Sequence, residues 1–312
     1  MKFTNRITAM LGIDLPVIQA PMGWIARSQL ASAVSNAGGM GIIETSSGEL
    51  DIIKEEIKKM RHLTDKPFGV NIAQAFVRDP NIAQFVIDQG VKFVTTSAGS
   101  PERYTEPLKS AGLTVFHVVP TLKAALKAVE AGVDGLIVEG GEGGGFKNPR
   151  EVASMVLLPL VSSKVNVPIV AAGGMVDGKT MAAAFALGAE AVQMGTRMVS
   201  CQESPVHENW KNAIVNAEET DTVFLNKFHS PALRALRTGR TTRLESAVEE
   251  NIMSEFGVPR DLYFGGDMEA AIPLSGQVCG RIESVKPVAD ILRETSEEFF
   301  ETLGSLSSQY LK

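Results

Sequence analysis

Eight short apolar runs recur along the first 200 residues and alternate with segments of helical spacing. Strands this apolar, without polar alternation, are typical of a parallel sheet that helices cover on both faces. Eight of them predict an α/β fold, a (β/α)8 TIM barrel, with a doubly wound open sheet as the alternative, although no GxGxxG follows the first run. The runs are PVIQAP (16–21), MGIIE (40–44), PFGVNIA (67–73), VKFVTTSA (91–98), LTVFHVVP (113–120), DGLIVEG (134–140), PIVAAGG (168–174) and AVQMGTRMV (191–199).

The pattern changes beyond residue 200. There the sequence predicts helices joined by polar segments, in SPVHENWKNAIVNAEETDTVFLNKFHSPALRALRTGR and its continuation. A loop-like stretch rich in glycine and proline follows, and the chain ends in an amphipathic helix. We therefore expect residues 1–200 to form the barrel and residues 201–280 to form a helical and loop appendage over its mouth. Residues 281–312 should form a C-terminal helix that packs on the barrel.

Charge and cysteine content exclude several classes of function. The net charge is −6 and the lysines and arginines are scattered, which argues against nucleic-acid binding. The sequence has no signal-peptide pattern and no apolar run long enough to span a membrane, so we expect a cytoplasmic protein. Two distant cysteines and four separated histidines predict neither a disulfide framework nor a metal site.

Glycines follow the last two predicted strands, in the loops AAGGMVDG and MGTRM. In a barrel of this kind a phosphate commonly binds these two loops. Gly173 and Gly174 would leave their N–H groups unobstructed, and Gly195 with Thr196 would add donors. The helix that begins near Gly178 should point its positive end at the anion. The alternative is that each glycine only permits a tight turn.

Residues at the ends of other strands should complete the floor of the site. Pro21, Met22 and Gly23 would expose backbone and a thioether to a planar ring, although core packing is the alternative for Met22. Asn71 carries an amide that both donates and accepts, as recognition of a heterocycle edge requires, and a turn cap is the alternative.

Together these segments resemble one enzyme family along nearly the whole chain. The matching motifs are QAPMGW, AVSNAGGMGII, KPFGVNI, EGGEGGG, VPIVAAGGMVDG, ALGAEAVQMGTRMV and LSGQVCG. They resemble the FMN-dependent nitronate monooxygenases, formerly 2-nitropropane dioxygenases, a family that also contains flavin-type enoyl-acyl-carrier-protein reductases. The resemblance implies a barrel with FMN at its mouth, and many members carry glutamine in place of Glu139. It implies cofactor contacts from Met22, Gly23, Asn71, Glu139, Gly144, Gly173, Gly174, Gln193, Gly195 and Thr196.

The sequence departs from the family at one catalytic position. Members typically carry a loop like EAGGH, whose histidine transfers protons, whereas residues 142–146 here read EGGGF. Phe146 cannot exchange a proton, while an imidazole can act as a general acid or base near neutral pH. His117 and His229 are the candidate replacements, with a structural role as the alternative for each. Cys201 has no neighbouring base in the sequence and is not expected to be a nucleophile.

The missing histidine favours oxidation of nitronates, which are already anions and need only FMN and O2. The first hypothesis is therefore a nitronate monooxygenase acting on a small-molecule substrate. A second is a flavin reductase of enoyl thioesters or quinones, with NADH or NADPH as a transient electron donor. A third, of another class, is a flavin-free barrel isomerase of phosphate esters. We expect no nucleic-acid or membrane partner, and a homodimer is compatible with the sequence.

Overall fold

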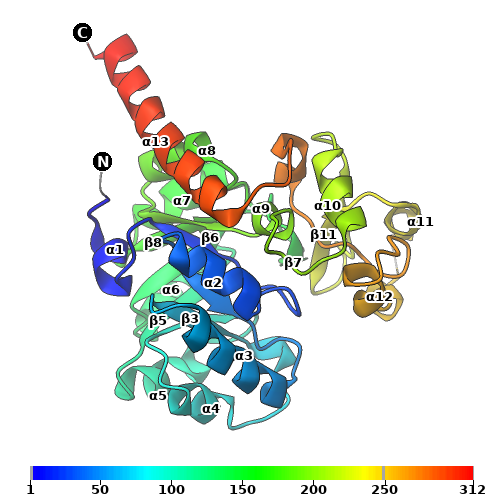
Figure 1. The fold of residues 1–312 in the computed structure, drawn as a ribbon, viewed down its shortest axis with the longest axis horizontal. Helices are drawn as coiled ribbons and strands as arrows, with labels where there is room; N and C mark the ends of the chain where they lie inside the picture. The colour runs from blue at the N-terminus through cyan, green and yellow to red at the C-terminus, as the bar shows by residue number, and fades with distance from the viewer. Residues whose placement is uncertain (1–2, 248–249, 312) are drawn as a thin grey trace.

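Eight parallel strands form a barrel in the computed structural model, which describes residues 3–247 and 250–311 (Figure 1). The strand order is β1-β9-β8-β6-β5-β4-β3-β2, and each strand falls within one of the eight apolar runs. This confirms the TIM barrel and rejects the open sheet. The strands are β1 (Val17–Gln19), β2 (Gly41–Ile43), β3 (Phe68–Ala73), β4 (Phe93–Ser97), β5 (Thr114–Val119), β6 (Gly135–Glu139), β8 (Ile169–Ala172) and β9 (Ala191–Met194).

The barrel closes between β1 and β2 by a single bridge rather than by a strand ladder. Ile18 pairs with Met40 in parallel fashion, and the Gln19 N–H donates to the Met40 carbonyl at 3.0 Å. The buried Gln19 side chain then accepts a hydrogen bond from the Ile42 N–H at 3.2 Å. A side-chain oxygen thus takes the place of a backbone carbonyl at this seam.

Helices surround the strands and bury the outer apolar faces (Figure 1). The barrel interior is a separate cluster that includes Phe93 and Phe116, whose rings meet edge to face at 5.2 Å. Helix α1 adds Ile7 and Leu11 to this interior cluster. The barrel helices are α1 (Arg6–Leu11), α2 (Ser28–Asn36), α3 (Leu50–Leu63), α4 (Ile82–Asp88), α5 (Thr105–Ser110), α6 (Leu122–Glu130), α7 (Ser154–Ser162), α8 (Gly178–Ala186) and α9 (Thr196–Val199), with 3-10 turns η1 (Gln74–Phe76) and η2 (Pro101–Arg103).

A second, three-stranded antiparallel sheet lies beside the barrel, in the order β10-β11-β7. Strand β7 (Gly145–Lys147) comes from the glycine-rich loop, whereas β10 (Thr222–Leu225) and β11 (Ala232–Leu236) come from the segment we expected to be helical. That expectation is wrong for these two strands. We call residues 208–281, which include β10 and β11, the insertion. Its other elements are α10 (Glu208–Val215), α11 (Gly239–Ser246), α12 (Pro259–Tyr263) and the turns η3 (Ile252–Glu255) and η4 (Gln277–Arg281).

The chain ends in the long helix α13 (Val288–Tyr310), as the sequence predicts. Its first half packs against α8 and α2, and its last turns project away from the body (Figure 1). None of the helices in the described ranges is both long and apolar enough to cross a membrane. The division into residues 1–200, 201–280 and 281–312 stays a proposal for the domain organisation.

Candidate functional site

A cavity of about 1140 Å³ opens at the C-terminal ends of the barrel strands, where barrel enzymes place their sites. The loops after β1, β3, β6, β8 and β9 line it together with parts of the insertion. All ten residues predicted to contact a cofactor lie in its lining, and so does His117. The fold therefore brings together side chains and glycines that are up to 174 residues apart in the sequence, from Met22 to Thr196.

The loop after β8 has the geometry of an anion site. Gly173 and Gly174 both have φ of +80°, a conformation that L residues rarely adopt. Within the described residues, the backbone N–H groups of Gly174 and Met175 donate to no other group. A Cβ on Gly173 would lie 2.7 Å from the Gly140 carbonyl oxygen, so only glycine allows the two loops to touch. These free donors suit a phosphate.

The N-terminus of α8 does not face the cavity, so our expectation that its positive end meets the anion is wrong. The Asp177 side chain caps this helix through the Thr180 N–H at 2.8 Å. The Gly178 N–H donates to Glu298 of α13 at 2.9 Å, and Gly178 packs on the backbone of Phe299. A carboxylate from α13 thus takes the N–H at the start of α8, and the loop residues Gly174 and Met175 keep their free donors.

Two buried polar atoms of the cavity wall have no partner among the described residues. They are Oε1 of Gln193 and Nε1 of Trp24, one acceptor and one donor. Buried polar groups are nearly always hydrogen-bonded, so these atoms fit a ligand with polar edges. Trp24 also has φ of +59°, which is rare outside glycine. Sequence reasoning missed Trp24, although it ends the motif QAPMGW.

The glycine-rich loop after β6 is held by hydrogen bonds to segments outside the loop. Glu142 accepts from the Ser154 N–H at 2.9 Å, at the first residue of α7. The buried Arg234 of β11 donates to the Gly141 carbonyl at 2.7 Å and pairs with Glu151 at 2.7 Å. These contacts fix a segment that glycine would otherwise leave conformationally free.

Lys147 of β7 forms an ion pair with Glu139 at the end of β6. The lysine side chain is 4% exposed and the carboxylate 25% exposed, and both line the cavity. The Lys147 ammonium also donates to the Gly140 carbonyl at 3.3 Å. Sequence reasoning missed Lys147 and Arg234, because the strands that bury them were not recognised.

Three phenylalanine rings from separate segments form one apolar wall of the cavity. The Phe146 ring lies 5.0 Å from that of Phe76 and is stacked on Phe256 at 6.1 Å with an interplanar angle of 9°. All three residues line the cavity. Where the family carries an imidazole, this chain therefore has an aromatic cluster, which favours an apolar ligand part.

The histidine candidates have different surroundings. His117 on β5 is buried, its Nδ1 lies 2.7 Å from the Thr96 hydroxyl, and burial lowers its pKa to about 4. A hydrogen bond to the backbone of Gly99 offsets this effect in part. The imidazole is therefore neutral at physiological pH. His229 lies in the turn between β10 and β11, outside the cavity lining.

Cys201 is fully buried behind the loop after β9 and does not line the cavity. Burial raises the pKa of its thiol to about 12. A thiolate is the reactive form of cysteine, so this residue is inert near neutral pH. The expectation that it has no nucleophilic role stays a prediction.

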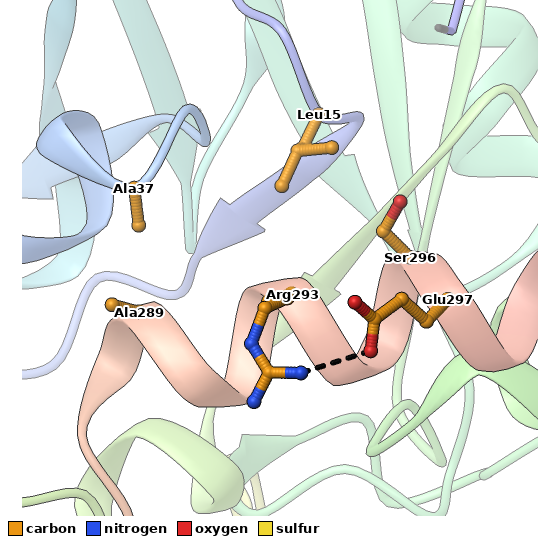
Figure 2. A pocket seen from close by; sticks show the side chains of 6 residues that line it. All are labelled: Leu15, Ala37, Ala289, Arg293, Ser296 and Glu297. Carbon is orange, nitrogen blue, oxygen red and sulfur yellow. Dashed lines mark hydrogen bonds and ion pairs between the residues drawn. The ribbon is translucent and has the colours of Figure 1, made fainter. Parts of the chain in front are cut away.

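A second, smaller cavity of about 300 Å³ lies between α13 and the segment that leads into β1 (Figure 2). Its charged groups, Arg293 and Glu297, pair with each other at 2.9 Å across one turn of the helix. It shares no residue with the large cavity. Of these two cavities, only the large one is the candidate site.

Comparison with known proteins finds similar enzymes along most of the chain. A family model described as nitronate monooxygenase matches residues 4–298. A curated relative from Mycobacterium tuberculosis, named (3aS,4S,5R,7aS)-5-hydroxy-7a-methyl-1-oxo-octahydro-1H-indene-4-carboxyl-CoA dehydrogenase, is 37% identical over 249 residues, or 79% of this chain and 70% of the relative. A probable nitronate monooxygenase of Staphylococcus saprophyticus is 33% identical over 72% of this chain and 76% of its own length.

Solved structures agree with the family match. FabK from Thermotoga maritima superposes with a TM-score of 0.94 at 40% identity and covers 98% of this chain and 99% of its own. A nitroalkane oxidase from Streptomyces ansochromogenes has a TM-score of 0.84 at 26% identity, over 97% of this chain and all of that one (100%). The similarity includes both the barrel and the insertion, since it spans nearly the full length.

Proposed function

The chain belongs to the nitronate monooxygenase family, and on that premise we propose that this oxidoreductase uses FMN to exchange a hydride with an acyl thioester. The proposed reaction interconverts a Cα–Cβ single and double bond of the acyl chain, for which a bound FMN would take or give the hydride at Cβ and solvent would exchange the proton at Cα. Family membership leaves the flavin-free isomerase, considered from sequence alone, without support.

The size of the cavity carries this proposal. Pockets that enclose one drug-sized ligand measure about 300–1,000 Å³, and this cavity measures about 1140 Å³. It has room for an elongated second ligand beside a flavin, whereas a small nitronate would leave much of it unfilled. A relative that acts on a carboxyl-CoA, at 37% identity, points in the same direction.

The residues present fit FMN. The free N–H groups of Gly174 and Met175 would hold the phosphate, and Gln193 and Trp24 would bond to polar edges of the ring or ribityl chain. FMN, when bound, supplies the group that accepts or gives the hydride. The protein would bind the cofactor and orient it against the substrate.

The aromatic wall would serve the other ligand. Phe76, Phe146 and Phe256 give an apolar surface along which an acyl chain can lie. Phe146 cannot donate or accept a proton, so it acts here by packing alone.

Nitronate oxidation with O2 is the second candidate, and Phe146 is the observation that favours it. A nitronate has already lost its α-proton, so it does not need the missing imidazole. The wall would then shield the anion from water. In the thioester proposal, NADH or NADPH would act as a transient electron donor when the reaction runs in the reductive direction.

The two candidates separate in one anaerobic experiment. Purified protein with bound FMN is mixed with a saturated acyl-CoA, an enoyl-CoA plus NADH or NADPH, a nitronate, and the corresponding neutral nitroalkane. We expect flavin bleaching by the acyl-CoA, or enoyl-dependent reoxidation after reduction by a nicotinamide. Bleaching by the nitronate alone would instead support the second candidate. Protein that is colourless and takes up no FMN would reject both.

A further inference from the structure

Arg78 lies at the rim of the large cavity, and its guanidinium has no partner in the part of the chain that the structure describes. Two lysines also line the cavity, and both are paired. Lys147 pairs with Glu139, and Lys127 pairs with Glu102 at 3.0 Å. An unpaired guanidinium at the rim of a cavity is free to bind an anionic ligand group.

The carboxylates that lie near Arg78 in the fold are engaged elsewhere. Asp79, the next residue in the chain, accepts a hydrogen bond from the Asn81 N–H at 2.8 Å. Glu49 forms ion pairs with Arg27 and Arg260. Neither carboxylate forms an ion pair with Arg78 among the described residues. The positive charge of Arg78 is therefore not neutralised by a contact within the chain.

Gly48, in the loop after β2, fixes the place of the Arg78 side chain. Gly48 has φ of +72°, a conformation that favours glycine. A Cβ at residue 48 would lie 3.2 Å from both Cδ and Nε of Arg78. The arginine side chain thus packs directly on the backbone of the glycine, and a methyl group there would displace it.

The position of Arg78 on the rim separates it from the loop proposed to hold the FMN phosphate. Arg78 follows β3, and that loop follows β8. In the closed barrel β6, β5 and β4 separate β8 from β3 on one side, and β9, β1 and β2 separate them on the other. The two strands therefore stand opposite each other, so Arg78 suits a second anion rather than the phosphate of FMN.

The aromatic wall leads towards this cation. Phe76, which packs against Phe146 in the wall, precedes Arg78 by only two residues, and all three line the cavity. A ligand that lies along the wall and reaches Arg78 must combine an apolar part with an anionic group. A thioester of phosphopantetheine has this order, because its acyl end is apolar and its far end carries a phosphate.

We propose that Arg78 is a specificity-determining residue that binds the phosphate of a phosphopantetheine arm, and that Gly48 is a positioning residue for its side chain. This inference rests on the proposed function, since it names the part of the acyl thioester that reaches the rim. The planar guanidinium can donate two parallel hydrogen bonds to one phosphate. Coenzyme A and carrier proteins share this arm, so thioesters of both would present the same phosphate.

The test compares enoyl thioesters that share one acyl chain but differ in the group beyond it. FMN-loaded protein is assayed with NADH and the thioester of coenzyme A, of phosphopantetheine, or of pantetheine, which lacks the phosphate. We expect Arg78→Met to raise KM about tenfold for the first two, and to leave KM for the pantetheine thioester and every kcat unchanged. Arg78→Lys should raise KM about threefold, because it keeps the charge but loses the fork.

Gly48→Ala keeps every charge and should raise KM for the same two thioesters, because its Cβ displaces the arginine. Gly90→Ala is its control, since Gly90 has φ of +66° and its Cβ would meet nothing within 4 Å. Arg150→Met is the control for Arg78→Met. Arg150 is exposed and, among the described residues, its side chain has no partner, but it does not line the cavity. Both controls should match the wild type.

Thioester turnover with equal KM values for the wild type and Arg78→Met would overturn this inference alone. So would an equal rise with and without the phosphate, an equal rise in Arg150→Met, or a rise confined to the coenzyme A thioester, which would assign Arg78 to the adenosine phosphates. A rise in KM for NADPH alone would assign it to the nicotinamide cofactor and overturn the inference too. Turnover of no thioester by the wild type would overturn the proposed function.

Calorimetric titration with coenzyme A and with pantetheine separates these two failures, because it needs no turnover. We expect Arg78→Met to bind coenzyme A about tenfold more weakly than the wild type and pantetheine equally well. This result in an enzyme that turns over no thioester would support the phosphate site while the proposed function falls. Equal binding of coenzyme A by the wild type and Arg78→Met would overturn the site.

Discussion

The two sides of the cavity are built in different ways. The barrel side, formed by the loops after β8 and β9, presents backbone N–H groups that glycines leave uncovered. The insertion side, formed by β7, β10 and β11, presents side chains held by other side chains, such as Phe146 and Arg234. At Gly173 the backbone surface leaves no room for a Cβ, whereas the side-chain surface can change one residue at a time. The chain departs from its family on the second side.

The largest effect should come from a methyl group on the barrel side. Gly173→Ala places a Cβ 2.7 Å from the Gly140 carbonyl, at a φ of +80°. We expect FMN binding to weaken at least about a hundredfold, because neither backbone can move aside. Gly112→Ala is the control, since Gly112 has φ of +81° but lies outside the cavity lining, and its Cβ would meet nothing within 4 Å. Equal affinities of the two variants in a fluorescence titration would refute the contrast.

On the insertion side, the largest effect should come from Arg234. Arg234→Met removes the bond to Gly141 and leaves Glu151 without its partner. We expect a loss of about 2–3 kcal/mol in the free energy of unfolding, measured with urea. Arg237→Met breaks a pair that is 37% and 42% exposed, and should cost less than about 0.5 kcal/mol. A loss for Arg234→Met no larger than the control's would show that Arg234 does not fix the loop.

The buried His117 on the barrel side should make the free energy of unfolding depend on pH. Burial lowers the pKa of His117 from 6.5 to about 4, so below pH 6.5 the unfolded chain binds a proton that the folded chain does not. Stability should therefore fall as pH decreases from about 6.5 to about 4. Between pH 7 and pH 4.5 the wild type should lose about 2 kcal/mol more than His117→Gln, in urea titrations at both pH values. Parallel losses would mean that His117 is not buried as described.

The smallest effect on stability should come from restoring the family's residue. Phe146→His weakens the ring contacts with Phe76 and Phe256 and should cost about 1 kcal/mol in thermal unfolding. It also adds a group that titrates near neutral pH. If the substrate needs a proton moved, turnover of a neutral nitroalkane or acyl-CoA should rise at least about tenfold and acquire a pH optimum. Unchanged rates would place the proton transfer elsewhere.

The sequence predicts the barrel well because its evidence is local. Each apolar run gives one strand, and the residues just after those runs reach the cavity because parallel strands end at the same rim. The insertion is different. Strands β10 and β11 have four and five residues, too few to separate a strand period from a helix period.

Long-range partners explain what else was missed. Arg234 pairs with Glu151, 83 positions away, and the N-terminus of α8 meets Glu298, 120 positions from Gly178. No pattern in a short window carries such information. The same holds for the pair of Lys147 and Glu139, which depends on β7 turning back along the loop.

The amide of Gln19, which closes the ring between β1 and β2, makes that joint unlike the seven others. Two backbone bonds hold this joint, from the Gln19 N–H to Met40 and from the Met40 N–H to Val17, and a rotamer change of Gln19 would free only the Ile42 N–H. This joint therefore has fewer backbone hydrogen bonds to lose than a strand ladder has. Since the segment that follows β1 carries Met22 and Trp24, any separation of β1 from β2 would widen the cavity mouth beside the Trp24 indole, whose N–H has no partner among the described residues.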